Sequence, residues 1–137
     1  MNRRSVSPGG SLVLDSEGLA KAVRRDRALT AWFSVAHADD LRIVTSAAIL
    51  VEVMHPRINR HALDWTLSRL IVELVSGEVA RLASTLLADA NLHGHRHAID
   101  AMLVATAMTA APPVTVLTSD PEDLSRLGGP RISVAKV

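Results

Sequence analysis

The chain has 137 residues, enough for one domain with a single core, and 48% of them are apolar, which excludes a disordered protein. It has no cysteine, which excludes disulfides and thiolate zinc sites and is consistent with the reducing cytoplasm where we expect it to act. A net charge of +1 argues neither for nor against a nucleic-acid partner, although thirteen of the fifteen basic residues are Arg, which suits phosphate contacts.

The order of apolar runs along the chain predicts strands that alternate with helices. Residues 1–10 have the Gly, Pro and Ser content of a flexible arm, and we expect one domain over 11–137. In chain order we expect a strand at 11–15, helices at 17–28 and 28–38, a strand at 41–46, helices at 47–55 and 60–68, a strand at 70–76, a helix at 77–93, a loop at 93–97, a helix at 98–110, a strand at 114–120, a short helix at 121–128 and a strand at 131–137. This alternation predicts an α/β fold with a parallel sheet of about five strands.

The longest uncharged run, residues 101–119, raises the question of a membrane span. Pro112 and Pro113 interrupt the run, so a buried helix followed by a buried strand fits it better. No apolar stretch follows the basic residues near the start, so we expect no signal peptide. We therefore expect no association with a membrane.

Four acids stand in apolar sequence where the alternating pattern brings them to one edge of the sheet. Asp15 and Asp120 each follow an apolar strand, and Asp100 lies in the first turn of the helix that leads into the fourth strand. Glu52 lies in the helix after the second strand, and helical side chains lean back toward the helix N-terminus. Because the carboxyl ends of parallel strands meet at one edge, we expect these four carboxylates to lie close together.

A bound metal ion would explain why four mutually repelling carboxylates are kept close together. Carboxylates held close repel one another, and the usual reason to tolerate this is a hard divalent cation such as Mg²⁺ or Mn²⁺. Carboxylate-bound Mg²⁺ serves phosphoryl transfer. Structural alternatives remain, because Asp15 and Asp120 could each cap the helix that follows, and Asp100 could interact with a helix dipole. Glu52, inside its predicted helix, has no capping role.

The four segments that carry these acids resemble the PIN-domain ribonucleases, in particular the VapC-type toxins of bacterial toxin–antitoxin pairs. The matching stretches are LVLDS, TSAAILVE, AIDAMLVATA and VLTSDPEDL, which occur in order over about residues 11 to 135. The resemblance implies a three-layer α/β/α fold with a parallel sheet in the strand order 3-2-1-4-5. It implies catalytic metal ligands, namely Asp15, Glu52, Asp100 and Asp120, which hold Mg²⁺ or Mn²⁺. It also implies supporting positions, namely Ser16, Thr118 and Asp123.

The resemblance further implies a toxin that hydrolyses phosphodiester bonds in structured RNA, tRNA or rRNA, and a cognate antitoxin protein that binds it. A homodimer or a toxin–antitoxin hetero-oligomer is the expected assembly. The chain departs from the family at Glu17, where a small hydroxyl residue is common, and at Leu124, where Phe is usual. Basic residues of the first helix are candidate RNA contacts, namely Lys21, Arg24 and Arg25.

Other interpretations of the same residues stay open. The stretch HGHRH carries three alternating histidines, His93, His95 and His97, which could bind zinc or nickel, although a polar loop is the simpler interpretation. A receiver-like phospho-accepting signalling module shares the size, the parallel sheet and the acidic pocket, but it would need paired acids after the first strand. A catalytically silent PIN-fold binding module would keep the fold without needing the four acids.

Overall fold

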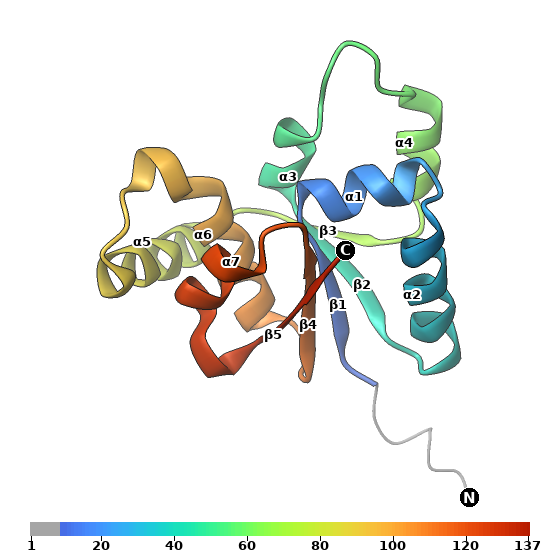
Figure 1. The fold of residues 1–137 in the computed structure, drawn as a ribbon. Helices are drawn as coiled ribbons and strands as arrows, with labels where there is room; N and C mark the ends of the chain where they lie inside the picture. The colour runs from blue at the N-terminus through green and yellow to red at the C-terminus, as the bar shows by residue number, and fades with distance from the viewer. Residues whose placement is uncertain (1–8) are drawn as a thin grey trace, which may run out of the picture.

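The computed structural model describes residues 9–137 and contains one sheet of five parallel strands (Figure 1). The strand order is β3-β2-β1-β4-β5, as predicted. A flexible arm is predicted for residues 1–10, and residues 1–8 of it lie outside the described residues. The strands are β1 (Ser11–Leu14), β2 (Arg42–Ser46), β3 (Ile71–Glu73), β4 (Val114–Thr118) and β5 (Ser133–Lys136).

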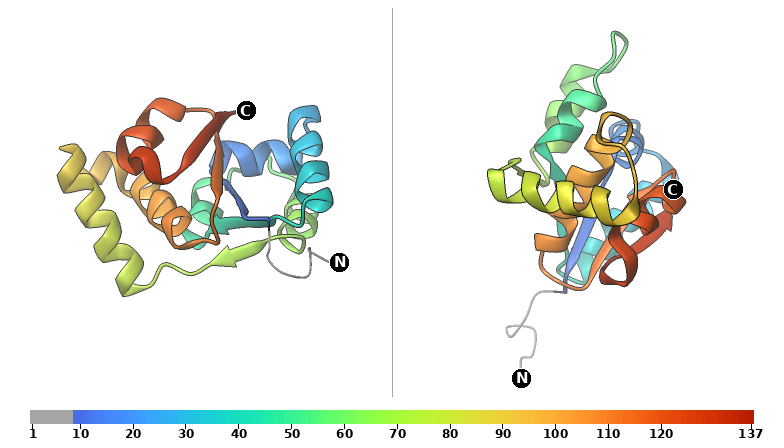
Figure 2. Two further views of the ribbon diagram at one scale, coloured as in Figure 1. Left: turned by 90° about the horizontal axis from the view of Figure 1, so that it is seen from below. Right: turned by 90° about the vertical axis from the view of Figure 1, so that its left-hand side faces the viewer.

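Helices cover both faces of this sheet and complete a three-layer α/β/α sandwich (Figures 1 and 2). Crossovers between parallel strands are right-handed, so those that step from β1 toward β3 place their helices on one face, and those that return to β4 and β5 use the other. The first group is α1 (Ser16–Val23), α2 (Arg27–Ala38), α3 (Ala47–Glu52) and α4 (Arg60–Leu67). The second group is α5 (Gly77–Ala90), α6 (Gly94–Thr109) and α7 (Pro121–Gly128), followed by a short 3-10 turn at Gly129–Arg131.

The central strand β1 is buried along its whole length, which explains its unbroken apolar sequence. It pairs with β2, where Leu12 lies beside Ile43, and with β4, where Leu14 lies beside Leu117. The residues that follow β1, β2 and β4 therefore emerge at the same edge of the sheet, the upper edge in Figure 1. The observed strand order also excludes the receiver-like alternative, because that fold has the order 2-1-3-4-5.

The uncharged run of residues 101–119 forms a buried helix followed by a buried strand, as expected. Most of α6 from Ala101 to Ala107 is inaccessible to solvent, and so are Val116 and Leu117 of β4. Within residues 9–137, no helix has both the length and the apolar character needed to span a bilayer.

The loop predicted at 93–97 is wrong, because this stretch forms the first turn of α6. The amides of Arg96 and His97 both donate to the carbonyl oxygen of His93, at 3.2 and 3.0 Å. His97 then leaves helical geometry, with φ −120° and ψ 16°, so the helix bends there before it continues. The polar composition of the tract predicted a loop, but these local backbone hydrogen bonds are enough to close a turn.

Several predicted helix and strand ends are also shifted. The helix predicted at 17–28 stops at Val23 because Arg25 adopts a positive φ of 57°, after which Asp26 caps α2 by accepting from the amides of Ala28 and Leu29. The helix predicted at 47–55 ends at Glu52, and β3 covers only three of the residues predicted at 70–76. β3 is an edge strand that pairs with β2 alone, so fewer of its residues are held in a ladder.

Candidate functional site

Asp15 follows β1 directly and is only 9% exposed. Its Oδ1 accepts a hydrogen bond of 2.7 Å from the amide of Gly18, so Asp15 does cap α1, as the structural interpretation of this residue predicted. The close approach favours a glycine, because a Cβ at Gly18 would lie 3.0 Å from the carbonyl oxygen of Leu117 and 3.4 Å from Asp15 Oδ1. Capping fixes the orientation of the Asp15 carboxylate and keeps it at the sheet edge.

The environment of Asp15 favours its neutral form more than water would. Burial raises the pKa of its carboxyl group above the ordinary value of 3.8. Hydrogen bonds from the Thr118 hydroxyl and the Gly18 amide oppose this rise in pKa, whereas the charges of Glu17 and Glu52 add to it. Glu17, the departure noted in the sequence, therefore does make the surroundings of Asp15 more acidic.

Asp100 stands at the centre of the acidic group, near the start of the straight part of α6. The pKa of its carboxyl group is raised to about 6 from an ordinary value of 3.8, and burial is the largest cause. The negative charges of Glu52, Asp123 and Asp15 contribute to this rise in pKa, and the charge of His97 opposes it. Three other carboxylates thus lie close enough to Asp100 to disfavour its charged form.

Glu52 reaches the group from the opposite side of the sheet edge, as the last residue of α3. The side chain of Ser46, at the end of β2, caps this short helix by accepting from the amide of Ala48 at 3.2 Å. The Glu52 side chain is exposed, yet its charge raises the pKa of both Asp15 and Asp100. The structure therefore brings three of the four predicted acids together.

Asp123 and His97 complete the group around Asp100. One potential ligand atom from each of these three side chains lies within 4.8 Å of the other two. Asp123, predicted as a supporting residue, comes from the first turn of α7, and all three side chains are partly buried. His97 lies three residues before Asp100, a spacing that places two helical side chains on one face, so the sequence did carry a signal for it.

Asp120 is placed differently from the other three predicted acids. It is exposed and occupies the cap position of α7, but its side chain makes no capping hydrogen bond. Its backbone amide donates to the buried Thr118 hydroxyl at 2.9 Å. Its charge is not among those that shift the pKa of Asp15 or Asp100. As a metal ligand, Asp120 remains a prediction.

Among the described residues, no Lys or Arg side chain forms an ion pair with Asp15, Glu52, Asp100 or Asp123. Within residues 9–137, the ion pair found joins Arg24 to Glu17 at 3.5 Å, on the exposed side of α1. Lys21 is half-buried and Arg25 is exposed on the same helix and the turn after it. Carboxylates with raised pKa values and no basic partner fit a divalent cation, which prefers oxygen ligands and would remove the repulsion.

Several solved structures of toxin–antitoxin complexes contain a chain with the same architecture. A chain of VapBC2 from Rickettsia felis, bound to a promoter DNA fragment, has a TM-score of 0.68 at 17% identity, over 93% of this chain and 98% of that chain. The chain has a PIN-like fold. A chain of a toxin–antitoxin complex from Klebsiella pneumoniae has a TM-score of 0.65 at 19% identity, over 92% of this chain and 99% of that chain. A chain of FitAcB from Neisseria gonorrhoeae has a TM-score of 0.57 at 19% identity, over 90% of this chain and 95% of that chain.

The PIN-like fold confirms, at the level of architecture, the resemblance that the four sequence segments indicate. The amino-acid sequence itself matches no family model and no curated protein. Identities of 17% and 19% establish the fold alone, so the chemistry has to be argued from the residues at the sheet edge.

Proposed function

We propose that this protein is a metal-dependent endoribonuclease, the toxin of a toxin–antitoxin pair, and that it cleaves structured RNA such as tRNA or rRNA. The observation that carries the proposal is the convergence of Asp15, Glu52, Asp100 and Asp123 at the carboxyl edge of a PIN-like sheet. The intact acids favour catalysis over a silent binding module, because unbalanced carboxylates cost stability that a pure binding protein has no reason to keep.

The site residues divide the work of phosphodiester hydrolysis. Mg²⁺, or Mn²⁺ in its place, would be held by Asp15, Asp100, Asp123 and Glu52, with Asp120 as the further ligand that the family resemblance implies. The ion would supply Lewis-acid stabilisation of the developing negative charge. The Gly18 amide orients the Asp15 carboxylate at the sheet edge. A carboxylate takes the proton of the attacking water as the new P–O bond forms and the bond to the leaving oxygen breaks.

A polyanionic substrate suits the charge of the rest of the molecule. If the four predicted acids are offset by metal, 15 basic residues face 10 remaining acids, a balance of +5. We infer that Lys21, Arg24 and Arg25, on and just after the helix that Asp15 caps, contact the RNA backbone.

The first test is RNA cleavage by the purified protein. Incubation with total RNA and Mg²⁺ should give discrete fragments, EDTA should abolish cleavage, and Mg²⁺ or Mn²⁺ should restore it. The matched variant is Glu52→Gln, because an exposed side chain can be neutralised without disturbing the core. It should lose cleavage at an unchanged melting temperature, and should relieve the growth defect that the wild type causes without an antitoxin. Cleavage that persists in EDTA would contradict the proposal.

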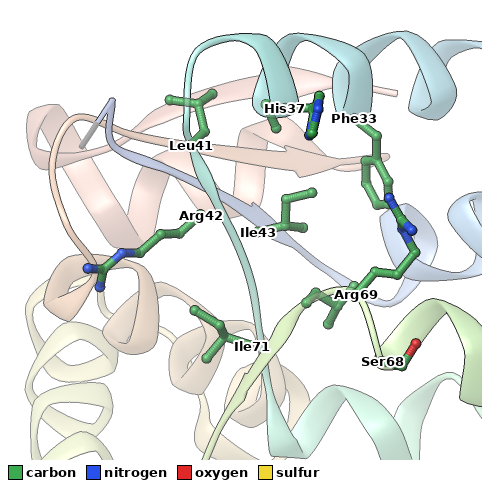
Figure 3. A pocket seen from close by; sticks show the side chains of 10 residues that line it. Phe33, His37, Leu41, Arg42, Ile43, Ser68, Arg69 and Ile71 are labelled. Carbon is green, nitrogen blue, oxygen red and sulfur yellow. The ribbon is translucent and has the colours of Figure 1, made fainter. Parts of the chain in front are cut away.

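We further propose that the antitoxin occupies a groove between α2 and α4, here called the Trp65 groove. Two adjoining cavities of about 620 and about 430 Å³ share three lining residues, Phe33, His37 and Arg69. Figure 3 shows Arg69 reaching toward Phe33 at one end of the smaller cavity. Trp65 is 50% exposed, and the guanidinium groups of Arg25 and Arg69 lie 5.3 and 5.1 Å from its ring centre.

The side chains that line the Trp65 groove indicate which kind of partner would bind there. Neither cavity is lined by an acid, whereas both are lined by arginine and aromatic side chains. A partner segment that alternates apolar and acidic residues would cover the exposed Trp65 and pair with the arginines. The structure from Klebsiella pneumoniae that shares this fold is a toxin–antitoxin complex, which supports a protein partner for this chain. The homodimer and the hetero-oligomer remain predictions.

If a small reading frame lies adjacent to the gene, co-purification with its product tests the partner assignment. Arg69→Glu reverses a groove charge and should reduce the amount of partner recovered. Arg81→Glu is the matched control, because Arg81 is an exposed arginine of α5 that lines neither cavity. Equal loss of the partner in both variants would remove the Trp65 groove as the binding surface.

A further inference from the structure

The side chain of His97 lies beside the acidic side chains and has one buried, unpaired nitrogen. This nitrogen is Nδ1, which has no hydrogen-bond partner within residues 9–137. One of its ring nitrogens also belongs to the group whose atoms lie within 4.8 Å of one another, together with oxygens of Asp100 and Asp123. In proteins, buried polar atoms nearly always have a partner, so this nitrogen calls for an explanation.

A direct interaction with the neighbouring acids does not provide that partner. Among the described residues, no hydrogen bond or ion pair joins His97 to Asp100 or Asp123. The three side chains are nevertheless held on one side of α6 and the first turn of α7, too far apart to bind one another and close enough to share a ligand. A metal ion lies about 2.0 to 2.2 Å from imidazole nitrogen and carboxylate oxygen, so small side-chain movements would let all three reach one ion.

The bend in α6 falls at His97 itself. His97 is the residue that leaves helical geometry, and its amide still donates to the carbonyl oxygen of His93. The turn that holds His93 and His95 is thereby set off from the rest of the helix, and both of those side chains are exposed. The three histidines are therefore not equivalent, and only His97 joins the acids.

We propose that His97 is a nitrogen ligand of the metal that the proposed nuclease uses, and that it shifts the preference of the site from Mg²⁺ toward a first-row transition ion such as Mn²⁺ or Co²⁺. The inference rests on the proposed metal-dependent function. Mg²⁺ takes oxygen ligands and retains its waters, and gains little from an imidazole. Affinity of nitrogen-containing sites for divalent transition ions rises from Mn²⁺ to Co²⁺, so a mixed nitrogen and oxygen set discriminates against Mg²⁺.

The test reads the ligand directly and does not depend on cleavage. Mn²⁺ is added to the full-length protein, and electron spin echo spectroscopy is used to look for nitrogen hyperfine coupling to the manganese. The wild type should show this coupling. His97→Gln should lose it and bind Mn²⁺ about tenfold more weakly or worse, with a smaller loss for Mg²⁺. His95→Gln is the matched control and should behave as the wild type, since its imidazole is exposed and outside the group.

Each outcome separates this inference from the proposed function. Mn²⁺ that binds to the wild type without nitrogen coupling overturns the role of His97 and leaves a carboxylate metal site in place. Coupling that persists in His97→Gln assigns the nitrogen to another residue and overturns the inference as well. A wild type that binds neither Mn²⁺ nor Mg²⁺ overturns the metal centre itself, and the RNA-cleavage assay should then also fail. Melting curves in EDTA show whether each variant is folded.

Discussion

Replacing Asp100 with Asn should lower the rate of RNA cleavage by about a hundredfold or more. The same change should leave the metal-free protein at least as stable as the wild type near neutral pH. The loss of cleavage follows from the central place of Asp100 among Glu52, Asp123 and Asp15. The gain in stability follows from the same surroundings. Asn has nearly the same shape and no charge, so it removes the repulsion without opening a cavity.

The stability difference should depend on pH in a defined way. The folded protein binds the Asp100 proton more tightly than the unfolded chain does, because the pKa is about 6 in the fold and 3.8 ordinarily. The cost of this group is therefore absent below pH 3.8, grows as pH rises between the two values, and is complete above about pH 6. The difference between the pKa values sets an upper limit of about 3 kcal/mol, which solvent screening reduces.

Thermal melts of both proteins in EDTA across this pH range provide the measurement. Subtracting the two curves removes the effect of burial on Asp15, which both proteins share, and leaves the contribution of Asp100 together with its repulsion of the neighbouring acids. Excess Mn²⁺ should then raise the melting temperature of the wild type more than that of Asp100→Asn, because ligand binding to the folded state alone stabilises it. A variant that melts well below the wild type in EDTA at pH 7 would identify Asp100 as a structural hydrogen-bonding residue instead.

The parallel sheet and the edge where the acids meet could be predicted because they depend on features that a single sequence displays, whereas the strand order β3-β2-β1-β4-β5 was implied by the family resemblance. Unbroken apolar runs such as residues 11–14 mark buried parallel strands, and parallel strands bring their ends to one edge. Asp15 and Asp100 are fixed by that topology, since each is within a few residues of a strand or helix end. Glu52 needed only the backward lean of a helical side chain in addition.

The finer composition of the site depends on local backbone geometry, which the apolar pattern does not report. The bend at His97 comes from one residue with non-helical angles in an otherwise helical stretch. Whether Asp120 or Asp123 joins the acidic group depends on where α7 begins. Pro121 starts that helix immediately after Asp120, so Asp123 falls in its first turn, and its side chain leans toward the sheet edge.

Asp123→Asn should therefore weaken Mn²⁺ binding and RNA cleavage more than Asp120→Asn does. Asp123 has a carboxylate oxygen within 4.8 Å of the ligand atoms of Asp100 and His97, and its charge raises the pKa of Asp100. Asp120 is exposed and does not affect the pKa of either buried acid. We expect a loss of metal affinity of about tenfold or more for Asp123→Asn, and a much smaller one for Asp120→Asn.

The two variants are matched controls for each other, because they make the same chemical change three residues apart and neither residue caps α7 through its side chain. Mn²⁺ titration of the purified proteins measures the difference, with cleavage of total RNA as the second readout. Asp123→Asn should also lower the pKa of Asp100, so the pH window of the Asp100 effect should narrow in that background. If Asp120→Asn instead causes the larger loss, the turn between Thr118 and Pro121 must bring the Asp120 carboxylate to the metal on binding. The amide of Asp120 would then have to give up or lengthen its hydrogen bond to the Thr118 hydroxyl, which is also a hydrogen-bond partner of Asp15.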